Sequence, residues 1–310
     1  MTLRFSIVVP TLNRRQMLGT ALASIRAQSW PETQVIVADG GSNDGTLDDL
    51  RGAPDLEVVS GPDRGVYDAF NRGIARANGD LIGILNSDDS YEPGAFAAAA
   101  AALAPGVAAV CGTAVIFSDA GIVARFDDGR DKSLASPRAA LISAGCSINA
   151  RFFRSEAMAR VGAFRVDYRY VADRDWLLRW YEAGLVTATI PDVVYRYRQH
   201  AGSLTFDADR RRERGLRKEL IRLARHWRNS DQSSSETRRT AMLLEGRCVA
   251  VLAAQAMRAG RFGESAHWLF QRDGRPSLVP LLAAACGGVD RAKEGARASF
   301  TRSRGLASPT

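Results

Sequence analysis

The sequence predicts an α/β fold in which helices flank a mostly parallel sheet and an α-helical C-terminal extension follows. Through the first half of the chain, short apolar runs alternate with segments of helical spacing, a pattern that predicts βαβ units. Beyond residue 205 the apolar spacing is helical only. The first four strands are expected at Phe5–Val9, Val35–Ala38, Glu57–Ser60 and Leu81–Leu85, and the first of them is expected to be fully buried.

Helices are predicted between these strands because apolar residues recur there every three or four positions. They are expected at Asn13–Gln28, Thr46–Arg51 and Tyr67–Asn78, and the pair Asn78-Gly79 is expected to end the third. A polar connection is predicted at Asp119–Ser136. The second half adds helices after Glu92, at Glu156–Val161 and at Asp173–Ala183, and strands near Ala108–Cys111, Ala114–Phe117, Arg151–Phe153, Thr187–Ile190 and Val193–Tyr197.

We divide the chain into a globular domain, residues 1–205, and an α-helical C-terminal region, residues 206–310. The helical region opens with Asp207–Arg228, in which apolar residues recur at helical spacing among arginines. A polar linker at 229–235 precedes a predicted helical hairpin, Ala241–Met257 and Phe262–Phe270. The last residues, Ala292–Thr310, are expected to fray.

Composition excludes several classes of protein. With 46% hydrophobic and 25% charged residues, the 310-residue chain can bury a sizeable core, so general disorder is not expected. No signal peptide or membrane span is predicted, and a cytoplasmic protein is expected. The four cysteines are widely spaced and form no CxxC pair; they are Cys111, Cys146, Cys248 and Cys286. This spacing fits neither a zinc site nor a disulfide scaffold.

The net charge of +8 is unevenly spread, and Arg210–Arg228 is densely basic. This helix would pack its leucine face on the globular domain, lie as a peripheral contact on the inner face of the plasma membrane, or mediate a homodimer. Packing is favoured because the apolar stripe is narrow and Glu213 and Glu219 interrupt the positive charge. No nucleic-acid partner is expected, since no recognised binding module accompanies the charge.

Polar side chains follow three of the predicted strands. Thr11 and Asn13 follow the first strand, Asp39 the second, and Asp88 the fourth. Ligands of parallel sheets bind beyond the carboxyl ends of the strands, so these residues are expected to share a site. Two adjacent carboxylates, Asp88 and Asp89, ionise together poorly without a cation. Mg²⁺ or Mn²⁺ sites commonly combine one or two carboxylates with substrate phosphates, which predicts a metal–diphosphate site.

Five segments in this order resemble the family 2 glycosyltransferases, including bacterial polysaccharide glycosyltransferases, which have the Rossmann-like GT-A fold. The resemblance covers residues 3–205, and no one of the motifs is specific alone. They are IVVPTLNR at Ile7–Arg14, DGGSNDGT at Asp39–Thr46, GVYDAFNRG at Gly65–Gly73, Gly79-Asp80, and LNSDD at Leu85–Asp89.

The resemblance implies a nucleotide-diphosphate sugar donor, and Asp39 matches the aspartate that binds the donor's base. The alternative is that Asp39 only shapes an Asx turn. Pro10, Thr11 and Asn13 would line the same pocket. Asp68 would reach the base or ribose, or would only balance the macrodipole at a helix N-terminus.

Asn86-Ser87-Asp88 occupies the family's DxD position, with asparagine in place of the first acid. Asp88 would hold Mg²⁺ or Mn²⁺ against the donor diphosphate. Asn86 would hydrogen-bond the ribose, and Asp89 would be an alternative metal ligand. The alternative is that Asn86–Asp89 is only a surface turn with unpaired acids.

The segment Asp173–Arg179 resembles the start of the family's helix that carries the catalytic base, with Ala172 where glutamate is usual. Asp173 matches the catalytic base of the family, and Asp175 is the competing candidate for that role. The alternative is that Asp173 only caps the helix. One base and a single displacement imply inversion. His200 would bind the diphosphate or metal, and Gly145–Arg154 sits where relatives bind the acceptor.

These implications predict an inverting, metal-dependent glycosyltransferase that uses a nucleotide-diphosphate sugar, most simply UDP-linked. The acceptor would be a saccharide or lipid-linked saccharide in surface polysaccharide or glycolipid synthesis. Two rivals stay open. One is a catalytically inactive nucleotide-sugar-binding module. It stays possible because Asn86 and Ala172 stand where the family usually has acidic residues. The other is a nucleotidyltransferase, although the first strand lacks the Gly-rich loop with a nearby lysine or arginine that such enzymes normally show.

Overall fold

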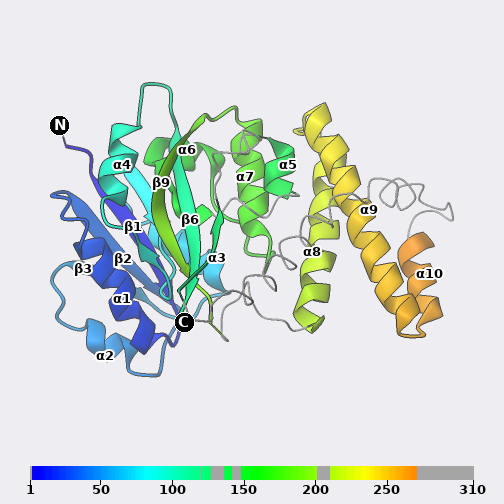
Figure 1. Ribbon diagram of the computed structural model, residues 1–310, viewed down its shortest axis with the longest axis horizontal. Helices are drawn as coiled ribbons and strands as arrows, with labels where there is room; N and C mark the ends of the chain where they lie inside the picture. The colour runs from blue at the N-terminus through cyan, green and yellow to red at the C-terminus, as the bar shows by residue number, and fades with distance from the viewer. Residues whose placement is uncertain (1, 120, 127–135, 142–147, 201–209, 271–310) are drawn as a thin grey trace, which may run out of the picture.

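The computed structural model describes residues 2–119, 121–126, 136–141, 148–200 and 210–270 of the 310-residue chain (Figure 1). Within these residues, helices flank a nine-stranded sheet whose order is β3-β2-β1-β4-β8-β6-β9-β5, with β7 paired to β6. Helices α8, α9 and α10 lie together at one end of the molecule, beyond α7 (Figure 1). The predicted α/β architecture with an α-helical C-terminal extension is confirmed.

The first half of the chain forms the predicted βαβ units. Strands β1 (Phe5–Thr11), β2 (Thr33–Asp39), β3 (Leu56–Ser60) and β4 (Leu81–Ile84) are parallel, and they alternate with α1 (Arg15–Arg26), α2 (Thr46–Leu50) and α3 (Val66–Ile74). The register places Thr11 beside Asp39 and Asp39 beside Ser60. The carboxyl ends of these strands therefore meet along one edge of the sheet, which we call the carboxyl edge.

The second half of the sheet is mixed in direction. Strand β8 (Arg151–Arg154) is antiparallel to β4 and to β6 (Ala109–Ser118), whereas β9 (Thr187–Arg198) is parallel to β6 and antiparallel to β5 (Ser90–Tyr91). Strand β7 (Gly121–Phe126) lies inside the segment predicted as a polar connection. The helices of this half are α4 (Ala95–Ala101), α5 (Pro137–Leu141), α6 (Ser155–Val161) and α7 (Ala172–Glu182).

Two predictions of separate strands were wrong, because β6 and β9 are each one long irregular strand. Their shared ladder shifts register near Gly112 and passes from Thr189 directly to Val193. Pro191 has no N–H for a ladder, so the irregularity at this point accommodates it. Gly112 lets β6 lie close to Val194 of β9, because a Cβ at position 112 would be only 2.5 Å from Val194 Cγ1.

The predicted end of the third helix at Asn78-Gly79 was also wrong. Helix α3 ends at Ile74, and the backbone N–H groups of Asn78 and Gly79 donate to Ser6 Oγ at 3.2 and 2.8 Å. A Cβ on Gly79 would lie 2.7 Å from the Arg4 carbonyl oxygen. The glycine is needed for the close packing of this turn against β1 rather than for a helix cap.

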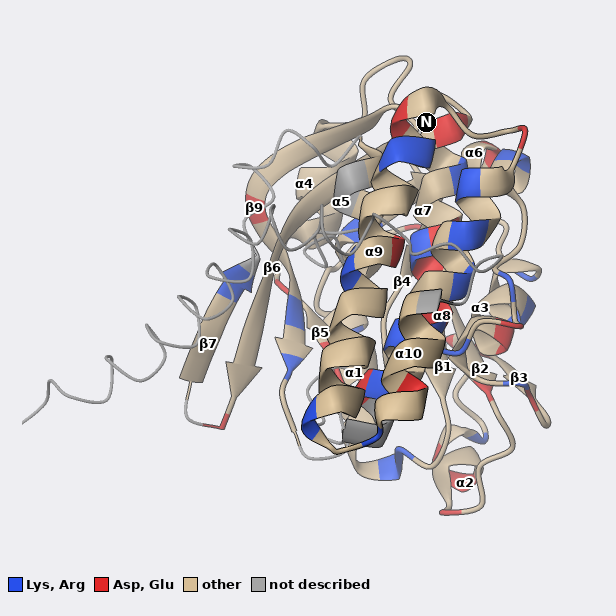
Figure 2. Ribbon diagram, turned by 90° about the vertical axis from the view of Figure 1, so that its right-hand side faces the viewer, with Lys and Arg blue, Asp and Glu red and all other residues tan. Residues whose placement is uncertain are grey.

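Helices α8 (Arg210–Asn229), α9 (Ser235–Arg258) and α10 (Phe262–Phe270) complete the molecule. Figure 2 shows them side by side, with Lys and Arg distributed over α8. One apolar cluster runs without a break from Phe153 and Trp176 of the α/β part to Trp227 of α8 and Leu252 of α9. The C-terminal helices therefore share a core with the sheet. The predicted boundary at 205/206 lies outside the described residues.

Helix α9 begins six residues before the predicted start at Ala241. Its N-cap is Ser234, whose hydroxyl accepts from Thr237 N at 3.2 Å. The early turns are polar, so apolar spacing missed them. Among the described helices, α9 alone is long and apolar enough to cross a membrane, and 56% of its apolar window is buried in the molecule. A buried core helix meets the same test, so this composition is weak evidence for a span.

Candidate functional site

Asp39 ends β2 at the carboxyl edge and is fully buried, with 0% of its surface exposed. Its carboxylate accepts hydrogen bonds from Gly41 N (2.9 Å), Ser42 N (3.0 Å), the Ser42 hydroxyl and the Ser60 hydroxyl (2.7 Å). Burial raises the pKa of Asp39, but these donors outweigh it, so the pKa lies below the ordinary value. The Asx-type turn is present, and base binding by Asp39 stays a prediction.

Pro10 and Thr11 at the end of β1, and Asn13 just after it, border this turn. Pro10 pairs with Ala38 in the ladder, and Asn13 has a left-handed backbone with φ of 52°. Asn13 N donates to Ser42 Oγ at 2.8 Å, and Asn13 Oδ1 accepts from Asn43 N at 2.9 Å. Thr11 is buried and, among the described residues, its hydroxyl has no hydrogen-bond partner. An unpaired buried hydroxyl is costly, which makes Thr11 Oγ1 a candidate contact for a ligand.

Asp68 lies in the first turn of α3 and is already engaged by the protein. Its carboxylate accepts from Arg64 N at 3.1 Å and from the Arg64 guanidinium at 3.2 and 3.4 Å. These hydrogen bonds lower the pKa of Asp68. Arg64 therefore already occupies this carboxylate at the start of α3, and both a donor contact and a balancing role at the helix N-terminus stay predictions.

The loop Asn86–Asp89 is tied to the end of β9 through Asp89. This carboxylate is 1% exposed and accepts from Tyr195 OH (2.6 Å), Arg198 N (2.8 Å) and Asn86 Nδ2 (3.0 Å). Burial, and then the charge of Asp88, raises the pKa of Asp89 to about 7 despite these donors. Both Asp89 oxygens are used inside the protein, so the geometry favours Asp88 over Asp89 as the metal ligand.

Asp88 has a different environment. Its side chain is 18% exposed, and its Oδ2 lies 3.0 Å from His200 Nε2. Among the described residues, no partner contacts its other oxygen, Oδ1. The structure therefore brings Asp88 and His200 together, and it leaves a carboxylate oxygen of Asp88 free to take a ligand.

These side chains fit a cation that is shared with a substrate. In the described part of the chain, no group of three or more His, Cys, Asp or Glu side chains is arranged as a metal cage. Mg²⁺ usually keeps waters and binds through one or two carboxylates plus substrate phosphates, so one free oxygen on Asp88 suits it.

Asp173 lies in the first turn of α7, whose N-cap is Val171 without a side-chain cap bond. Its Oδ1 accepts from Tyr67 OH at 3.1 Å and from Arg174 N at 2.9 Å, while Oδ2 has no partner among the described residues. Burial raises the pKa of Asp173 above the ordinary value, and Arg174 only partly opposes that shift. A carboxylate with a raised pKa and a free oxygen suits a general base.

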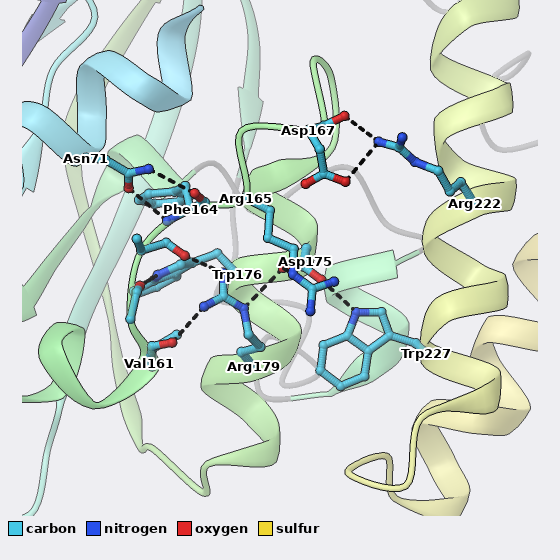
Figure 3. Close-up of polar contacts among 12 residues, drawn as sticks. Asn71, Val161, Phe164, Arg165, Asp167, Asp175, Trp176, Arg179, Arg222 and Trp227 are labelled. Carbon is cyan, nitrogen blue, oxygen red and sulfur yellow. Dashed lines mark hydrogen bonds and ion pairs between the residues drawn. The ribbon is translucent and has the colours of Figure 1, made fainter. Parts of the chain in front are cut away.

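Asp175, the competing base, lies in a buried ion-pair cluster (Figure 3). It is 0% exposed, its Oδ2 contacts Arg179 Nε at 3.1 Å and Arg165 Nε at 3.6 Å, and its Oδ1 accepts from Trp227 Nε1 at 3.0 Å. An acceptor hydroxyl cannot reach a carboxylate enclosed in this way. The geometry therefore favours Asp173 over Asp175 as the base and gives Asp175 a structural role.

The candidate residues lie at the carboxyl edge. Thr11 and Asp39 end neighbouring strands, and the loop with Asp88 follows β4 on the other side of β1. Asp173 comes from α7, but its contact with Tyr67 places it at the start of α3, the helix that follows β3. Of the predicted acceptor segment, residues 145–147 lie outside the described residues.

Sequence reasoning missed several partners of these acids. Tyr195 and Arg198, which hold Asp89, lie at the end of β9 near His200, and their target lies more than 100 residues earlier in the chain. The sequence places Tyr67 in the third helix and in the motif Gly65–Gly73, but gives it no role of its own. Its contact with Asp173 spans 106 positions, and no local pattern in the sequence signals it.

Comparison with known proteins identifies the family of the chain. The family model described as Glycosyl transferase family 2 matches residues 6–161. The chain is 31% identical over 205 residues to a PGL/p-HBAD biosynthesis glycosyltransferase of Mycobacterium bovis, covering 64% of this chain and 78% of that protein. It is 34% identical over 190 residues to an uncharacterized glycosyltransferase of Mycobacterium tuberculosis, covering 56% of this chain and 67% of that protein.

Solved structures support the fold. S. aureus TarS 1-349 in complex with UDP has a TM-score of 0.60 and 18% identity, covering 91% of this chain and 87% of that chain. The complex of TarS 1-349 with UDP-GlcNAc has a TM-score of 0.56 and 16% identity, covering 88% and 92%. At these identities the likeness concerns the fold, and the predicted GT-A fold is confirmed. On the strength of the family match and the mycobacterial relatives, this chain belongs to glycosyltransferase family 2.

Proposed function

We propose that this glycosyltransferase is an inverting enzyme that transfers a sugar from a UDP-linked donor to a hydroxyl group of an acceptor. The observation that carries the proposal is the difference between two kinds of aspartate at and near the carboxyl edge. Asp39, Asp89 and Asp175 are fully engaged by the protein, whereas Asp88 and Asp173 each keep one oxygen without a partner among the described residues.

In this proposal the donor lies along the carboxyl edge. The turn held by Asp39, together with the unpaired Thr11 hydroxyl, would receive the nucleoside, as the strand-end position of both residues supports. The complexes of TarS with UDP and UDP-GlcNAc support UDP as the nucleotide, because TarS shares the fold. Asn86 would contact the ribose, and Asp68 stays a weaker candidate because Arg64 already occupies its carboxylate.

The diphosphate would lie beside the pair formed by Asp88 and His200. A Mg²⁺ or Mn²⁺ ion held by Asp88 would supply Lewis-acid stabilisation of the departing diphosphate. His200, 3.0 Å from Asp88, would orient this carboxylate toward the diphosphate and its cation.

Asp173 would accept the proton of the acceptor hydroxyl. The acceptor oxygen then bonds to the anomeric carbon while the bond from that carbon to the diphosphate oxygen breaks, which releases UDP and inverts the configuration. Tyr67 donates to Asp173 Oδ1 and so holds the carboxylate with Oδ2 directed away from that bond. No second nucleophilic carboxylate is needed for a single displacement.

The proposal also covers the acceptor and the cellular location of the enzyme. The names of the mycobacterial relatives, which refer to PGL/p-HBAD biosynthesis, support an acceptor in glycolipid assembly, with surface polysaccharide as the wider class. Peripheral membrane contact through the basic helix α8 stays a prediction. Cytoplasmic location and homodimerisation stay predictions.

The test is UDP release by the full chain with a panel of UDP-sugars and Mn²⁺, measured with and without EDTA. We expect release that needs Mn²⁺ or Mg²⁺ and that Asp173→Asn reduces by about 10²-fold to 10⁴-fold, the usual contribution of a general base. Binding of UDP, followed by calorimetry, should persist in Asp173→Asn.

The same assay separates the rivals. Donor binding without turnover by the wild-type chain, with any acceptor supplied, would favour the inactive binding module. Transfer of a nucleoside monophosphate with release of pyrophosphate would favour a nucleotidyltransferase, which the family match already argues against. Turnover that EDTA leaves unchanged would remove the metal from the proposal.

A further inference from the structure

Helix α8 makes a concentrated set of polar contacts with one short segment, residues 167–175, which leads into α7 and forms its first turn. The Glu219 carboxylate accepts from Arg169 N at 2.9 Å and from Tyr170 N at 2.7 Å. The Arg222 guanidinium donates to the Asp167 carbonyl and lies 3.5 Å from the Asp167 carboxylate. These contacts fix the chain just before α7 begins.

The third contact is the buried hydrogen bond from Trp227 Nε1 to Asp175 Oδ1, 3.0 Å long (Figure 3). The other Asp175 oxygen is held by Arg179, which also donates to the Val161 carbonyl at 2.6 Å. Trp227 is 2% exposed and Asp175 is 0% exposed. The first turn of α7 is therefore anchored to α8 by a bond that water does not screen.

Asp173 and Asp175 face opposite sides of the same turn. Residues two positions apart on an α-helix do not share a face. Asp175 accordingly meets Trp227 of α8, while Asp173 meets Tyr67 of α3 at 3.1 Å. The start of α7 is held between these two helices, and a rotation or shift of α7 on the α8 side moves Asp173 on the other.

We propose that Trp227 is a positioning residue for the transfer step, which acts through Asp175 and the first turn of α7 to hold Asp173 in line with the acceptor hydroxyl. The inference rests on the proposed role of Asp173 as the base. It gives the C-terminal helices a part in catalysis that needs no contact with donor, acceptor or membrane.

The variant Trp227→Phe isolates the indole N–H, because the phenyl ring keeps most of the buried apolar volume. We expect kcat to fall about 10-fold to 100-fold, since a displacement of about 1 Å in a reacting group costs up to about 10²-fold in rate. The KM for the donor should stay within about 2-fold, because Thr11, Asp39 and Asp88 lie on elements that α8 does not contact through these bonds. Trp268→Phe is the matched control, as Trp268 is also buried and bonds only Glu264 of its own helix.

A second variant, Glu219→Gln, reaches the same segment by another route. Its amide keeps one acceptor oxygen, so one of the N–H groups of Arg169 and Tyr170 loses its partner. We expect the same pattern of lowered kcat with unchanged donor KM. Circular dichroism and thermal unfolding measure the folded fraction of each variant, so that rates refer to folded protein.

The decisive measurement combines Trp227→Phe with Asp173→Asn. If Trp227 acts only through Asp173, the double variant is no slower than Asp173→Asn alone. If Trp227→Phe lowers kcat by the same factor in the Asp173→Asn protein as in the wild type, the positioning role is overturned. A normal kcat for both Trp227→Phe and Glu219→Gln would overturn it too. Full activity of Asp173→Asn would instead remove the proposed base, which distinguishes failure of the proposed function from failure of this inference.

Discussion

Asp88 and Asp89 are neighbours in sequence, but they differ in burial and in their hydrogen bonds. Asp89 is buried and accepts hydrogen bonds from three donors, whereas Asp88 is partly exposed and keeps one oxygen without a partner among the described residues. The same division separates Asp175 from Asp173. At the residue scale, the aspartates that hold the fold and those available to a ligand are thus distinguished by their hydrogen bonds.

Substitution of Asp89 should lower stability. An asparagine side chain presents an NH₂ group to donors that now meet carboxylate oxygens, so at least one of Tyr195 OH, Arg198 N and Asn86 Nδ2 would face another donor. We expect Asp89→Asn to reduce the free energy of unfolding by about 1–3 kcal/mol in urea titrations. Asp88→Asn is the control, with a change below about 0.5 kcal/mol. Equal losses in the two variants would contradict this division of roles.

The pH dependence of the reaction reports on Asp173. Burial raises its pKa, and a base must be ionised to accept a proton, so activity should be lost as the pH falls through this raised pKa. The acid limb of kcat/KM should therefore lie above about 3.9, the pKa of an ordinary Asp. Rates measured from mildly acidic to neutral pH check this, after stability over that range is established. An acid limb at the ordinary value would argue against Asp173.

At the element scale, strand positions were easier to predict than strand continuity. Strands β1, β2 and β4 were located from their apolar runs, because a strand buried on both faces has few polar positions, whereas β3 is only partly buried. Breaks were predicted in β6 and β9 at Gly112 and near Pro191, where the structure instead has an irregular ladder. Local composition marks such a place as unusual, but only the partner strand decides whether the ladder continues.

The packing of α3 on the sheet gives a test at this scale. A Cβ on Gly73 would lie 2.3 Å from Val8 Cγ1, so α3 can approach β1 only with glycine at this position. We expect Gly73→Ala to lower the free energy of unfolding by about 1–3 kcal/mol through overpacking. Gly19→Ala on α1 is the control, since nothing lies within 4 Å of its Cβ. There, alanine should be neutral or stabilise by up to about 1 kcal/mol in the same measurement.

For the site, the sequence predicted which strand ends carry polar residues but not which acid is free. Strand-end position brought Thr11, Asp39 and Asp88 to one edge, and the structure agrees. The choice between Asp173 and Asp175 depends on Tyr67 and Trp227, which lie 106 and 52 residues away in the chain. Contacts over such separations arise from helix packing and leave no local pattern.

At the scale of the whole molecule, α8 and α9 belong to the core. Leu223 and Trp227 of α8, and Leu244 and Leu252 of α9, lie in the apolar cluster that includes Trp176 and Phe153. Removal of residues 207–310 should therefore expose this cluster. We expect the fragment 1–206 to aggregate or to lose its cooperative unfolding transition, as followed by gel filtration and thermal melting. A fragment that stays monomeric and melts like the full chain would show that the helices are dispensable for folding.

Titration of UDP into the protein by calorimetry, in the presence of Mn²⁺, tests the donor site most directly. Wild type and Asp173→Asn should bind UDP with similar affinity, and Asp88→Asn should lose the part of that affinity that depends on Mn²⁺. Addition of EDTA to the wild type should reproduce the Asp88→Asn result. Equal, metal-independent binding in all three proteins, or no binding in any, would contradict a donor site at the carboxyl edge.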